Sequence, residues 1–180
     1  MKRFYSLVLF VLFIASATAQ QLSAEEKKLF NLVMEYRQQN NLPPIPLSPS
    51  LTYVAQLHVK DLKENKPDTG VCNTHSWSAK GPWTACCYTP DHAKANCMWS
   101  KPKELTYYPG SGFEIACNAS DTLKAEKALE LWKASSGHNA VMLNQKMWKQ
   151  SNWKAIGIGM NEHYAVIWFG QETDESFKIR

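Results

Sequence analysis

The sequence predicts an α+β domain, because amphipathic helical segments and short apolar strands occur in one chain of moderate length. Apolar residues recur at helical spacing over three segments, about 24–40, 49–62 and 122–135. Three shorter segments read as strands, 113–116, 155–160 and 163–170, and the last two are expected to pair antiparallel across the turn at Asn161-Glu162. Together these elements predict helices packed on a small antiparallel sheet.

Capping residues define the starts of the first two helices. Ser23 and Glu26 have the pattern of a capping box. In this motif the hydroxyl at the helix start and the carboxylate three residues later each accept a hydrogen bond from the backbone N–H of the other residue. Ser48 precedes Pro49, and proline is favoured at the first helical position because its missing N–H has no partner there in any case.

The remaining segments carry weaker signals. The third helix is expected to start at a cap formed by Ser120 or Asp121. Residues 63–112 lack periodicity and are expected to be irregular, ordered by disulfides and aromatic packing. Residues 140–152 are ambiguous, with partial helical character, and the polar tail after Gln171 is expected to fray.

The N-terminus has the pattern of a secretory signal peptide. Two basic residues precede an apolar run from Leu7 to Ile14, and Ala17-Thr18-Ala19 fits the small-x-small cleavage rule. We therefore expect a signal peptide over 1–19 and a single domain over 20–180. The run is shorter than the roughly 20 residues of a membrane span; an uncleaved N-terminal anchor is the alternative.

Net charge argues against a nucleic-acid partner. The formal charge of the chain is +4, and loss of Lys2 and Arg3 with the signal peptide would leave +2. No run of lysine or arginine stands out in the remainder, whereas nucleic-acid-binding domains concentrate such residues.

All five cysteines follow the signal pattern, at Cys72, Cys86, Cys87, Cys97 and Cys117. Export would place them in an oxidising compartment, where disulfides persist. Two bridges and one free thiol are the simplest arrangement. Adjacent cysteines rarely pair with each other, because disulfide geometry prefers Cα atoms about 5.5 Å apart. We therefore expect a disulfide-stapled insert over about 72–117; a metal–thiolate cluster is the competing interpretation, although the spacings do not repeat paired C-x-x-C motifs.

Three short segments, read in order, resemble the CAP superfamily of cysteine-rich secretory proteins, venom antigens, plant pathogenesis-related proteins and their microbial relatives. They are Asn73-Thr74-His75-Ser76-Trp77, Gly112-Phe113-Glu114-Ile115-Ala116 and the stretch 131–139, which is followed by Gly157-Ile158-Gly159. The stretch 131–139 contains W-x-x-S-x-G-H, which is similar to the microbial form of the family. The resemblance implies a three-layer α-β-α sandwich, the CAP or SCP fold, with a small antiparallel sheet between helices.

The resemblance also implies a cleft. His75 lies in a loop where the family places its first cleft histidine, and His138 corresponds to the second. Glu114 looks like the glutamate of the family segment E-N-[IL]-A, although this chain lacks the asparagine. Animal members usually carry a second glutamate where this chain has Ser135.

Three further histidines have different expected roles. His58 lies in a segment similar to H-x-x-D-[LM] on the second helix of microbial members, where a helix places Asp61 one turn away. We favour a structural histidine that is hydrogen-bonded to the loop covering it. His92 is expected at the surface of the insert, and His163 at the start of a strand.

The cleft residues suggest one kind of chemistry and one alternative. Two neutral imidazoles can donate lone pairs to a divalent ion such as Zn²⁺, and a carboxylate can hold an imidazole in the required tautomer. His75 and His138 are therefore candidate metal ligands, with Glu114 as candidate base. Because Ser135 replaces a carboxylate, any binding of zinc or another divalent cation is expected to be weak. The alternative is a satisfied polar network that fixes the cleft walls.

Aromatic residues gather in and around the insert, at Trp77, Trp83, Trp99, Tyr107, Tyr108 and Phe113. Exposed, they would suit sugar rings or a lipid; buried, they would supply the core that such a loop lacks. We favour burial for most of them.

The function predicted from the sequence is that of a secreted, non-enzymatic CAP-domain protein, extracellular or, in a bacterium, periplasmic or on the cell surface. Its expected partner is an extracellular ligand, either a lipid or sterol, a glycan or other cell-surface component, or a protein, and the protein itself is expected to be a monomer. One alternative is a metal-assisted hydrolase using His75, His138 and Glu114; another is a structural cell-surface protein with a vestigial cleft. No Gly-x-Ser-x-Gly, papain-like cysteine or phosphate-binding loop occurs. Asn118 begins a glycosylation sequon, which matters only in a eukaryotic secretory pathway.

Overall fold

A three-stranded antiparallel sheet forms the middle layer of the structure, a computed structural model that describes residues 21–175 and 177–180. The strand order is β1-β3-β2, with bounds β1 (Gly112–Asn118), β2 (Ala155–Met160) and β3 (Tyr164–Gly170). β1 pairs with β3 only, so one edge of β1 is left free of other strands. The predicted signal peptide, 1–19, lies outside the described residues.

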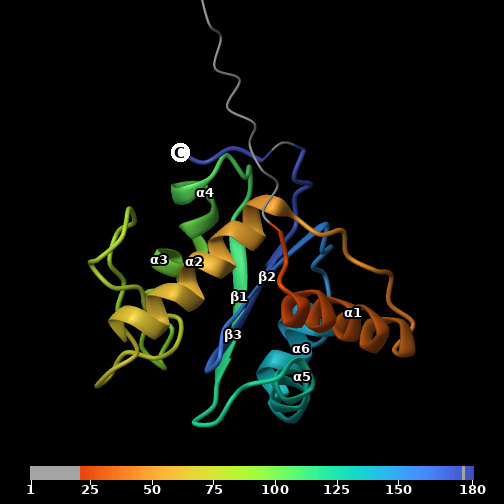
Figure 1. The fold of residues 1–180 in the computed structure, drawn as a ribbon. Helices are drawn as coiled ribbons and strands as arrows, with labels where there is room; N and C mark the ends of the chain where they lie inside the picture. The colour runs from red at the N-terminus through yellow and green to blue at the C-terminus, as the bar shows by residue number, and fades with distance from the viewer. Residues whose placement is uncertain (1–20, 176) are drawn as a thin grey trace, which may run out of the picture.

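Helices cover both faces of this sheet (Figure 1). One face carries α2 (Pro49–Asn65), with the short helices α3 (Ala95–Trp99) and α4 (Lys101–Leu105) beside it. The other face carries α1 (Ala24–Gln39), α5 (Ala125–Ala134) and α6 (Ser136–Met142), followed by the 3₁₀ turn η1 (Lys146–Trp148). This is the α+β, three-layer α-β-α arrangement that the sequence resemblance implies.

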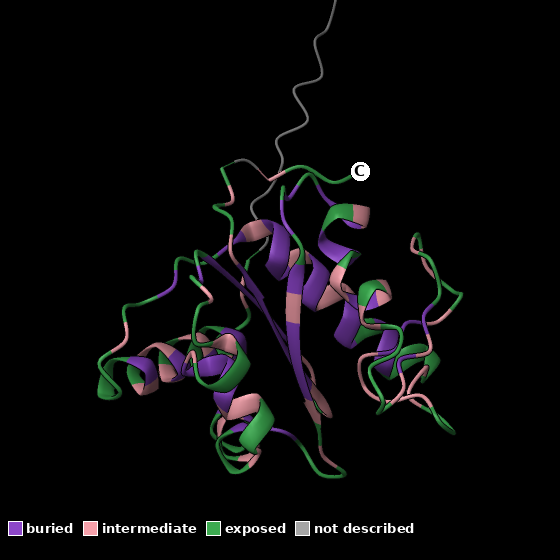
Figure 2. Cartoon of the chain, turned by 180° about the vertical axis from the view of Figure 1, so that it is seen from behind, coloured by how far each residue is buried: buried purple, intermediate pink, exposed green. Residues whose placement is uncertain are grey.

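The alternation of side chains along the strands builds two separate cores. Ile115 and Ile167 point to the α1–α5 side, whereas Ala116 and Val166 point to the α2 side. Figure 2 shows the buried residues concentrated in the sheet and on the helix faces that meet it. The same alternation places the Glu114 side chain on the α2 side, toward the helix that carries His58.

Two glycines of β2 allow α2 to lie directly on the sheet. A Cβ atom added to Gly157 would lie 2.1 Å from the carbonyl carbon of Leu51, and one added to Gly159 would lie 2.3 Å from that of Ala55. Both contacts are with helix backbone, which cannot move aside as a side chain can. The Gly157-Ile158-Gly159 motif therefore sets the distance between α2 and the sheet.

The helix starts follow the predicted caps in two of three cases. Ser23 and Glu26 make both bonds of the capping box, and the Ser48 hydroxyl accepts from the Leu51 N–H. The prediction of a cap at Ser120 or Asp121 was wrong, because α5 begins only at Ala125.

The late start of α5 has a tertiary cause. The N–H groups of Ala119 and Leu123 bond to the carbonyls of His163 and Glu162, which holds the chain extended beside the turn between β2 and β3. The first N–H of α5 then donates to the Glu25 carboxylate of α1 at 3.0 Å. A residue about a hundred positions away in the sequence thus caps this helix.

Two other expectations about regular structure need correction. Residues 63–112 are not irregular throughout, because α3 and α4 lie within them. The tail after Gln171 does not fray in its described part: the Asp174 carboxylate accepts from Ser48 and from both the N–H and the hydroxyl of Ser50, at 2.6–2.9 Å. The ambiguous stretch 140–152 comprises the end of α6 and the turn η1.

The cysteines form two bridges and one free thiol, as predicted. Cys72 pairs with Cys87 and Cys86 pairs with Cys97, so the adjacent cysteines do take different partners. Cys117 lies in β1 with a free thiol, and burial raises its pKa to about 12. Both bridges join positions within residues 72–97, so they cross-link the insert internally.

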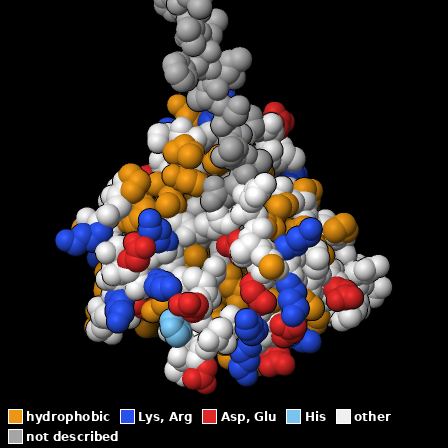
Figure 3. Space-filling view, viewed as in Figure 1, with side chains coloured by type: hydrophobic (Ala, Val, Ile, Leu, Met, Phe, Trp, Pro, Cys, Tyr) orange, Lys and Arg blue, Asp and Glu red, His pale blue; other side chains and the backbone are white. Residues whose placement is uncertain are grey.

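The exposed charges are mixed in sign. Acidic and basic side chains alternate over the face shown in Figure 3, and several form exposed ion pairs, such as Lys63 with Glu162 and Lys127 with Glu130. This pattern gives no broad basic surface there for nucleic acid. Over residues 21–175 and 177–180, no helix is long and apolar enough to cross a membrane.

The close contact between α2 and β2 predicts that an added methyl group destabilises the protein at Gly157 but not at Gly137, which lies outside this contact. Gly157→Ala should lower the free energy of unfolding by about 1–3 kcal/mol, because its methyl group meets the α2 backbone. Gly137→Ala is the matched control: nothing lies within 4 Å of its added Cβ, so loss of unfolded-state freedom should stabilise the protein by about 0.4–1 kcal/mol. Urea denaturation measures both; equal effects at the two glycines would contradict the packing described.

Candidate functional site

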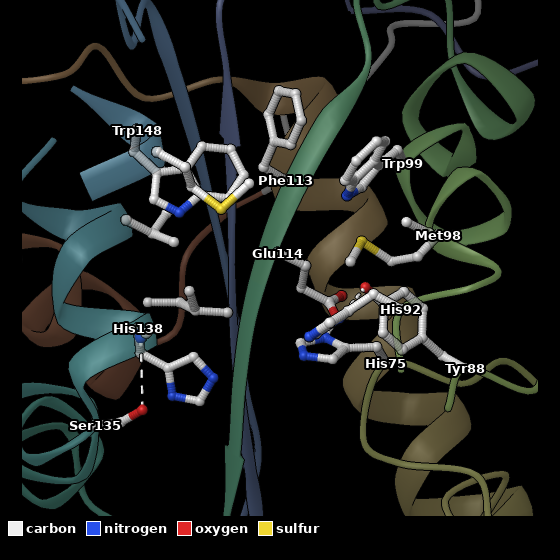
Figure 4. Close-up of a pocket in the computed structure, with 15 residues that line it drawn as sticks. His75, Tyr88, His92, Met98, Trp99, Phe113, Glu114, Ser135, His138 and Trp148 are labelled. Atoms are coloured by element: carbon white, nitrogen blue, oxygen red, sulfur yellow. Dashed lines mark hydrogen bonds and ion pairs between the residues drawn. The ribbon is translucent and has the colours of Figure 1, made fainter. Parts of the chain in front are cut away.

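A cavity of about 430 Å³ lies against the free edge of β1 (Figure 4). Three parts of the chain form its walls. Residues 113–115 of β1 form the base. Residues 75–99 of the insert, which include α3, form one side, and α6 with η1 form the other. The cavity therefore exists because β1 has no strand partner on this side and because the insert rises beside it.

One end of the cavity is polar and centres on a buried carboxylate. Glu114 Oε2 lies 2.6 Å from His58 Nδ1, and Glu114 Oε1 lies 2.6 Å from His75 Nδ1. The side chains of Glu114 and His58 are fully buried, and that of His75 is 14% exposed. One carboxylate thus joins α2 to the loop of the insert, with both of its oxygens hydrogen-bonded.

The second nitrogen of His58 settles its protonation state. His58 Nε2 lies 2.9 Å from the carbonyl oxygen of Ser76, which can only accept a hydrogen bond. Since Nε2 donates to this carbonyl and Nδ1 faces the carboxylate, His58 holds both protons and forms a buried imidazolium–carboxylate pair with Glu114. The indole of Trp77 stacks on this ring, with centroids 4.2 Å apart and planes 7° from parallel, which favours a cation.

The pKa of Glu114 is consistent with this pair. Burial by itself would raise the pKa of the carboxyl, but the positive charge of His58 and the hydrogen bonds from His58 and His75 outweigh burial and hold the pKa below its usual value. Glu114 is therefore a carboxylate at neutral pH. A lone buried carboxylate would be costly, and the two imidazoles remove that cost.

His75 reaches the cavity from a loop of the insert, and two contacts fix its position. Its backbone N–H donates to Asn73 Oδ1 at 3.0 Å, and its ring meets the edge of Tyr88, with centroids 5.2 Å apart. Since Nδ1 is committed to Glu114, Nε2 is the nitrogen left for the cavity. It has no hydrogen-bond partner in the part of the chain that the structure describes.

His138 lies on the α6 wall, across β1 from His75 in Figure 4. Burial, the main cause, lowers its pKa to about 4, so its ring is neutral at neutral pH. No side-chain hydrogen bond of His138 occurs within residues 21–175 and 177–180. Its ring therefore offers the cavity one lone pair and one N–H.

Ser135 supplies the start of α6. It is the N-cap of the helix, and its hydroxyl accepts a long hydrogen bond of 3.5 Å from the His138 N–H. The hydroxyl thus serves the helix start and fixes the position of His138. The residue at the position where the sequence resemblance implied a missing carboxylate therefore begins the helix in this chain.

The rest of the cavity is apolar. Phe113 contacts Trp99 on one side and Trp148 on the other, with ring centroids 5.4 Å and 5.1 Å apart. Met98 lies beside the polar end, and Met147, with 80% of its surface exposed, lies at the mouth. Flexible thioethers and aromatic rings adapt to varied apolar shapes.

The aromatic residues named from the sequence divide between core and cavity. Trp77 and Tyr108 are buried, as favoured, and Trp83 is half-buried against Trp77. Trp99 and Phe113 are half-buried and line the cavity, whereas Tyr107 is exposed on another surface.

The structure brings together the four side chains that the resemblance assigned to a cleft. His75, Glu114, Ser135 and His138 all line this cavity. His163 precedes β3 and bonds to the Ala119 carbonyl, away from the cavity, as expected of a residue at a strand start.

His58 and His92 have larger roles than the sequence suggested. His58 does bond to the loop that covers it, but it also forms the ion pair with Glu114; the H-x-x-D segment was the signal that could have placed it at the site. His92 is exposed, as expected, yet it lies at the mouth of the cavity, where its Nδ1 lies 2.9 Å from the Tyr88 hydroxyl.

The donor set does not fit a zinc centre. Such a centre takes at least three protein ligands, and within the described residues no group of three or more His, Cys, Asp or Glu side chains is placed to hold a metal ion. Both oxygens of Glu114 and the Nδ1 of His75 are already hydrogen-bonded to each other or to His58. Among the described residues that line the cavity, His75 Nε2 and one nitrogen of His138 remain as imidazole donors, which are too few for such a centre.

The chain matches the model of one protein family. The model of the cysteine-rich secretory protein family, CAP, matches residues 30–168, which include all of the sheet except the last two residues of β3, and all residues that line the cavity. This chain belongs to the CAP family. Among curated proteins, none matches the chain.

Solved structures similar to this CAP domain come from bacteria. An SCP-domain extracellular protein of Bacillus anthracis has a TM-score of 0.54 at 18% identity over 82% of this chain. An outer surface protein of Borrelia burgdorferi has a TM-score of 0.53 at 16% identity over 87%. A cysteine-rich secretory protein of Staphylococcus aureus has a TM-score of 0.50 at 16% identity over 82%.

These likenesses show the fold. This chain covers 40% and 39% of the Bacillus and Staphylococcus chains, but all of the Borrelia chain. This chain therefore spans less than half of the Bacillus and Staphylococcus chains.

The environment of His138 predicts a pH dependence of stability. In the unfolded chain this histidine takes up a proton near pH 6.5, whereas in the folded protein it does so only near pH 4. Between these pH values the unfolded state binds more protons than the folded state. The stabilisation that comes from burying neutral His138 is therefore fully present above pH 6.5 and is lost as pH falls toward 4. His138→Asn should therefore show a shallower fall of unfolding free energy across this window than the wild type.

Urea denaturation at a series of pH values measures this difference. Titrations of other groups are common to both proteins and cancel in the comparison. Parallel stability curves for wild type and His138→Asn would contradict the burial of a neutral His138.

Proposed function

We propose that this protein is a secreted, non-enzymatic CAP-domain protein that binds a small amphiphilic ligand in the cavity beside β1. The observation that carries the proposal is the division of this cavity into an apolar part, walled by Trp99, Phe113 and Trp148, and a polar end at His75 and His138. A volume of about 430 Å³ is in the range of small-molecule sites.

The apolar walls favour binding over simple structural packing. Trp148 and Phe113 remain half-buried, and Met147 leaves most of its side chain in solvent at the mouth. An apolar ligand would remove this surface from water, with a gain of about 25 cal/mol per Å². The partly exposed aromatic and thioether side chains of the walls therefore support the proposal of an apolar ligand.

The polar end favours recognition over hydrolysis. A metal-assisted hydrolase would use Glu114 as its base, but both carboxylate oxygens accept imidazole N–H groups and the side chain is fully buried. Glu114 has no free oxygen to take a proton from water. The carboxylate instead holds the two histidines in place, which leaves hydrogen-bonding groups at His75 and His138.

Several observations support export. The signal pattern of residues 1–19 and the two disulfides suit an oxidising compartment. The similar Bacillus protein is extracellular, and the similar Borrelia protein is an outer surface protein. We therefore place the working domain outside the cytoplasm, with a ligand from that environment.

Binding of the neutral fluorescent dye N-phenyl-1-naphthylamine tests the proposal. The dye should bind the mature protein with increased fluorescence, and Trp148→Ala should weaken its binding at least about tenfold, because truncation of a tryptophan at a binding hot spot costs about 2 kcal/mol or more. Tyr107→Ala is the matched control, since it removes an exposed aromatic ring outside the cavity.

Two outcomes would contradict the proposal. One is the absence of dye binding by a folded wild-type protein. The other is equal weakening by Trp148→Ala and Tyr107→Ala, which would place the dye on the general surface.

A further inference from the structure

The cavity contains one buried pair of charges, and that pair is internally neutral. The titratable groups that face it are Glu114 and His75 at the polar end, His138 on the α6 wall, and Tyr88 with His92 on the insert side. The Glu114 carboxylate is matched by the His58 imidazolium behind it. Burial, and next the charge of Glu114, raise the pKa of Tyr88, so its phenol is neutral.

One carboxylate compensates one imidazolium. A second proton on His75 would leave the buried cluster with a net positive charge, which is costly away from water. His75 is therefore the neutral tautomer with its proton on Nδ1, where Glu114 accepts it at 2.6 Å. Its Nε2 then carries a lone pair, with no protein donor in the described chain to satisfy it.

The group that meets this lone pair has to donate a hydrogen bond. A carboxylate cannot donate, and it would bring a second anion close to Glu114. An ammonium group can donate, but it would add an uncompensated charge to a cavity whose walls are mostly apolar and, among the described residues, carry no free carboxylate. A hydroxyl donates to Nε2 and buries no charge.

We propose that the ligand is a neutral amphiphile whose hydroxyl donates a hydrogen bond to His75 Nε2, and that His58 is the positioning residue that sets this preference. This inference rests on the proposed binding function. His58 does not touch the ligand. It acts by supplying the positive charge that keeps Glu114 ionised, which leaves His75 neutral with its acceptor toward the cavity.

Three probes with the same apolar tail and different head groups test this inference at pH 7.5: 1-octanol, octanoate and octylammonium. Isothermal titration calorimetry of the mature protein gives each affinity. 1-Octanol should bind at least about tenfold more tightly than either charged probe, which corresponds to about 1.4 kcal/mol.

The outcomes separate the two proposals. Tighter or equal binding of octanoate or octylammonium would overturn the hydroxyl preference while leaving the cavity a ligand site. If the protein bound none of the three probes and also failed to bind the neutral dye, both the binding function and this inference would be overturned.

A His58→Asn variant tests the positioning role. Asparagine can still donate a hydrogen bond to Glu114 but carries no charge, so the proton that compensates the carboxylate should move to His75. His75 Nε2 would then be a donor, and the affinity ratio of octanol to octanoate should fall at least about tenfold. His163→Asn is the control, because it removes a histidine outside the cavity and should leave the ratio unchanged.

A second variant keeps the test independent of the buried His58. His75 is partly exposed, and His75→Leu removes the acceptor without disturbing α2. Octanol affinity should fall about tenfold, while the neutral dye, which fills the apolar part, should bind as before. Unchanged octanol binding by His75→Leu would overturn the assignment of Nε2 as the acceptor.

Discussion

The buried carboxylate of Glu114 ties together the three parts of the molecule that meet at the cavity. β1 carries it, α2 supplies His58 and the insert supplies His75, each at 2.6 Å. An unpaired carboxylate at this depth would be strongly destabilising, so the strand, the helix and the loop have to take up these relative positions for the charge to be buried at all. The site and the fold therefore depend on the same contact, because the hydrogen bond between Glu114 and His75 both positions the insert and orients His75 toward the cavity.

Other features of the structure keep this contact in place. The glycines of β2 bring α2 close to the sheet, which sets the depth at which His58 lies under β1. The two disulfides shape the insert, and within it the carbonyl of Ser76 accepts a hydrogen bond from His58 Nε2. Behind the α6 wall, the Arg37 guanidinium of α1 is buried with no carboxylate partner among the described residues, and burial lowers its pKa to about 10. It donates to the Met142 carbonyl and to Asn144 and thereby fixes the end of the helix that carries His138.

The sequence predicts local features of this fold well and tertiary ones poorly. Caps at Ser23 and Ser48 depend on neighbours within one turn, so they were visible in the sequence. The start of α5 was not, because its first N–H is capped by Glu25 from another helix. The same distinction applies to the site: motifs indicated His75, Glu114 and His138, whereas the doubly hydrogen-bonded state of His58 depends on the Ser76 carbonyl, which no side-chain pattern reports. The apolar wall of Met98 and Trp148 likewise exists only after the insert and η1 converge on β1.

Direct observation of the imidazole protons tests the central claim most directly. Nitrogen-15 NMR of the histidine rings in the wild-type protein at pH 7.5 distinguishes a doubly protonated ring from either neutral tautomer. The structure predicts a doubly protonated His58, and a neutral His75 with its proton on Nδ1 and a lone pair on Nε2. A singly protonated His58, a doubly protonated His75 or a His75 tautomer with its proton on Nε2 would each contradict the account, because the cavity would then present a different hydrogen-bonding group to its ligand.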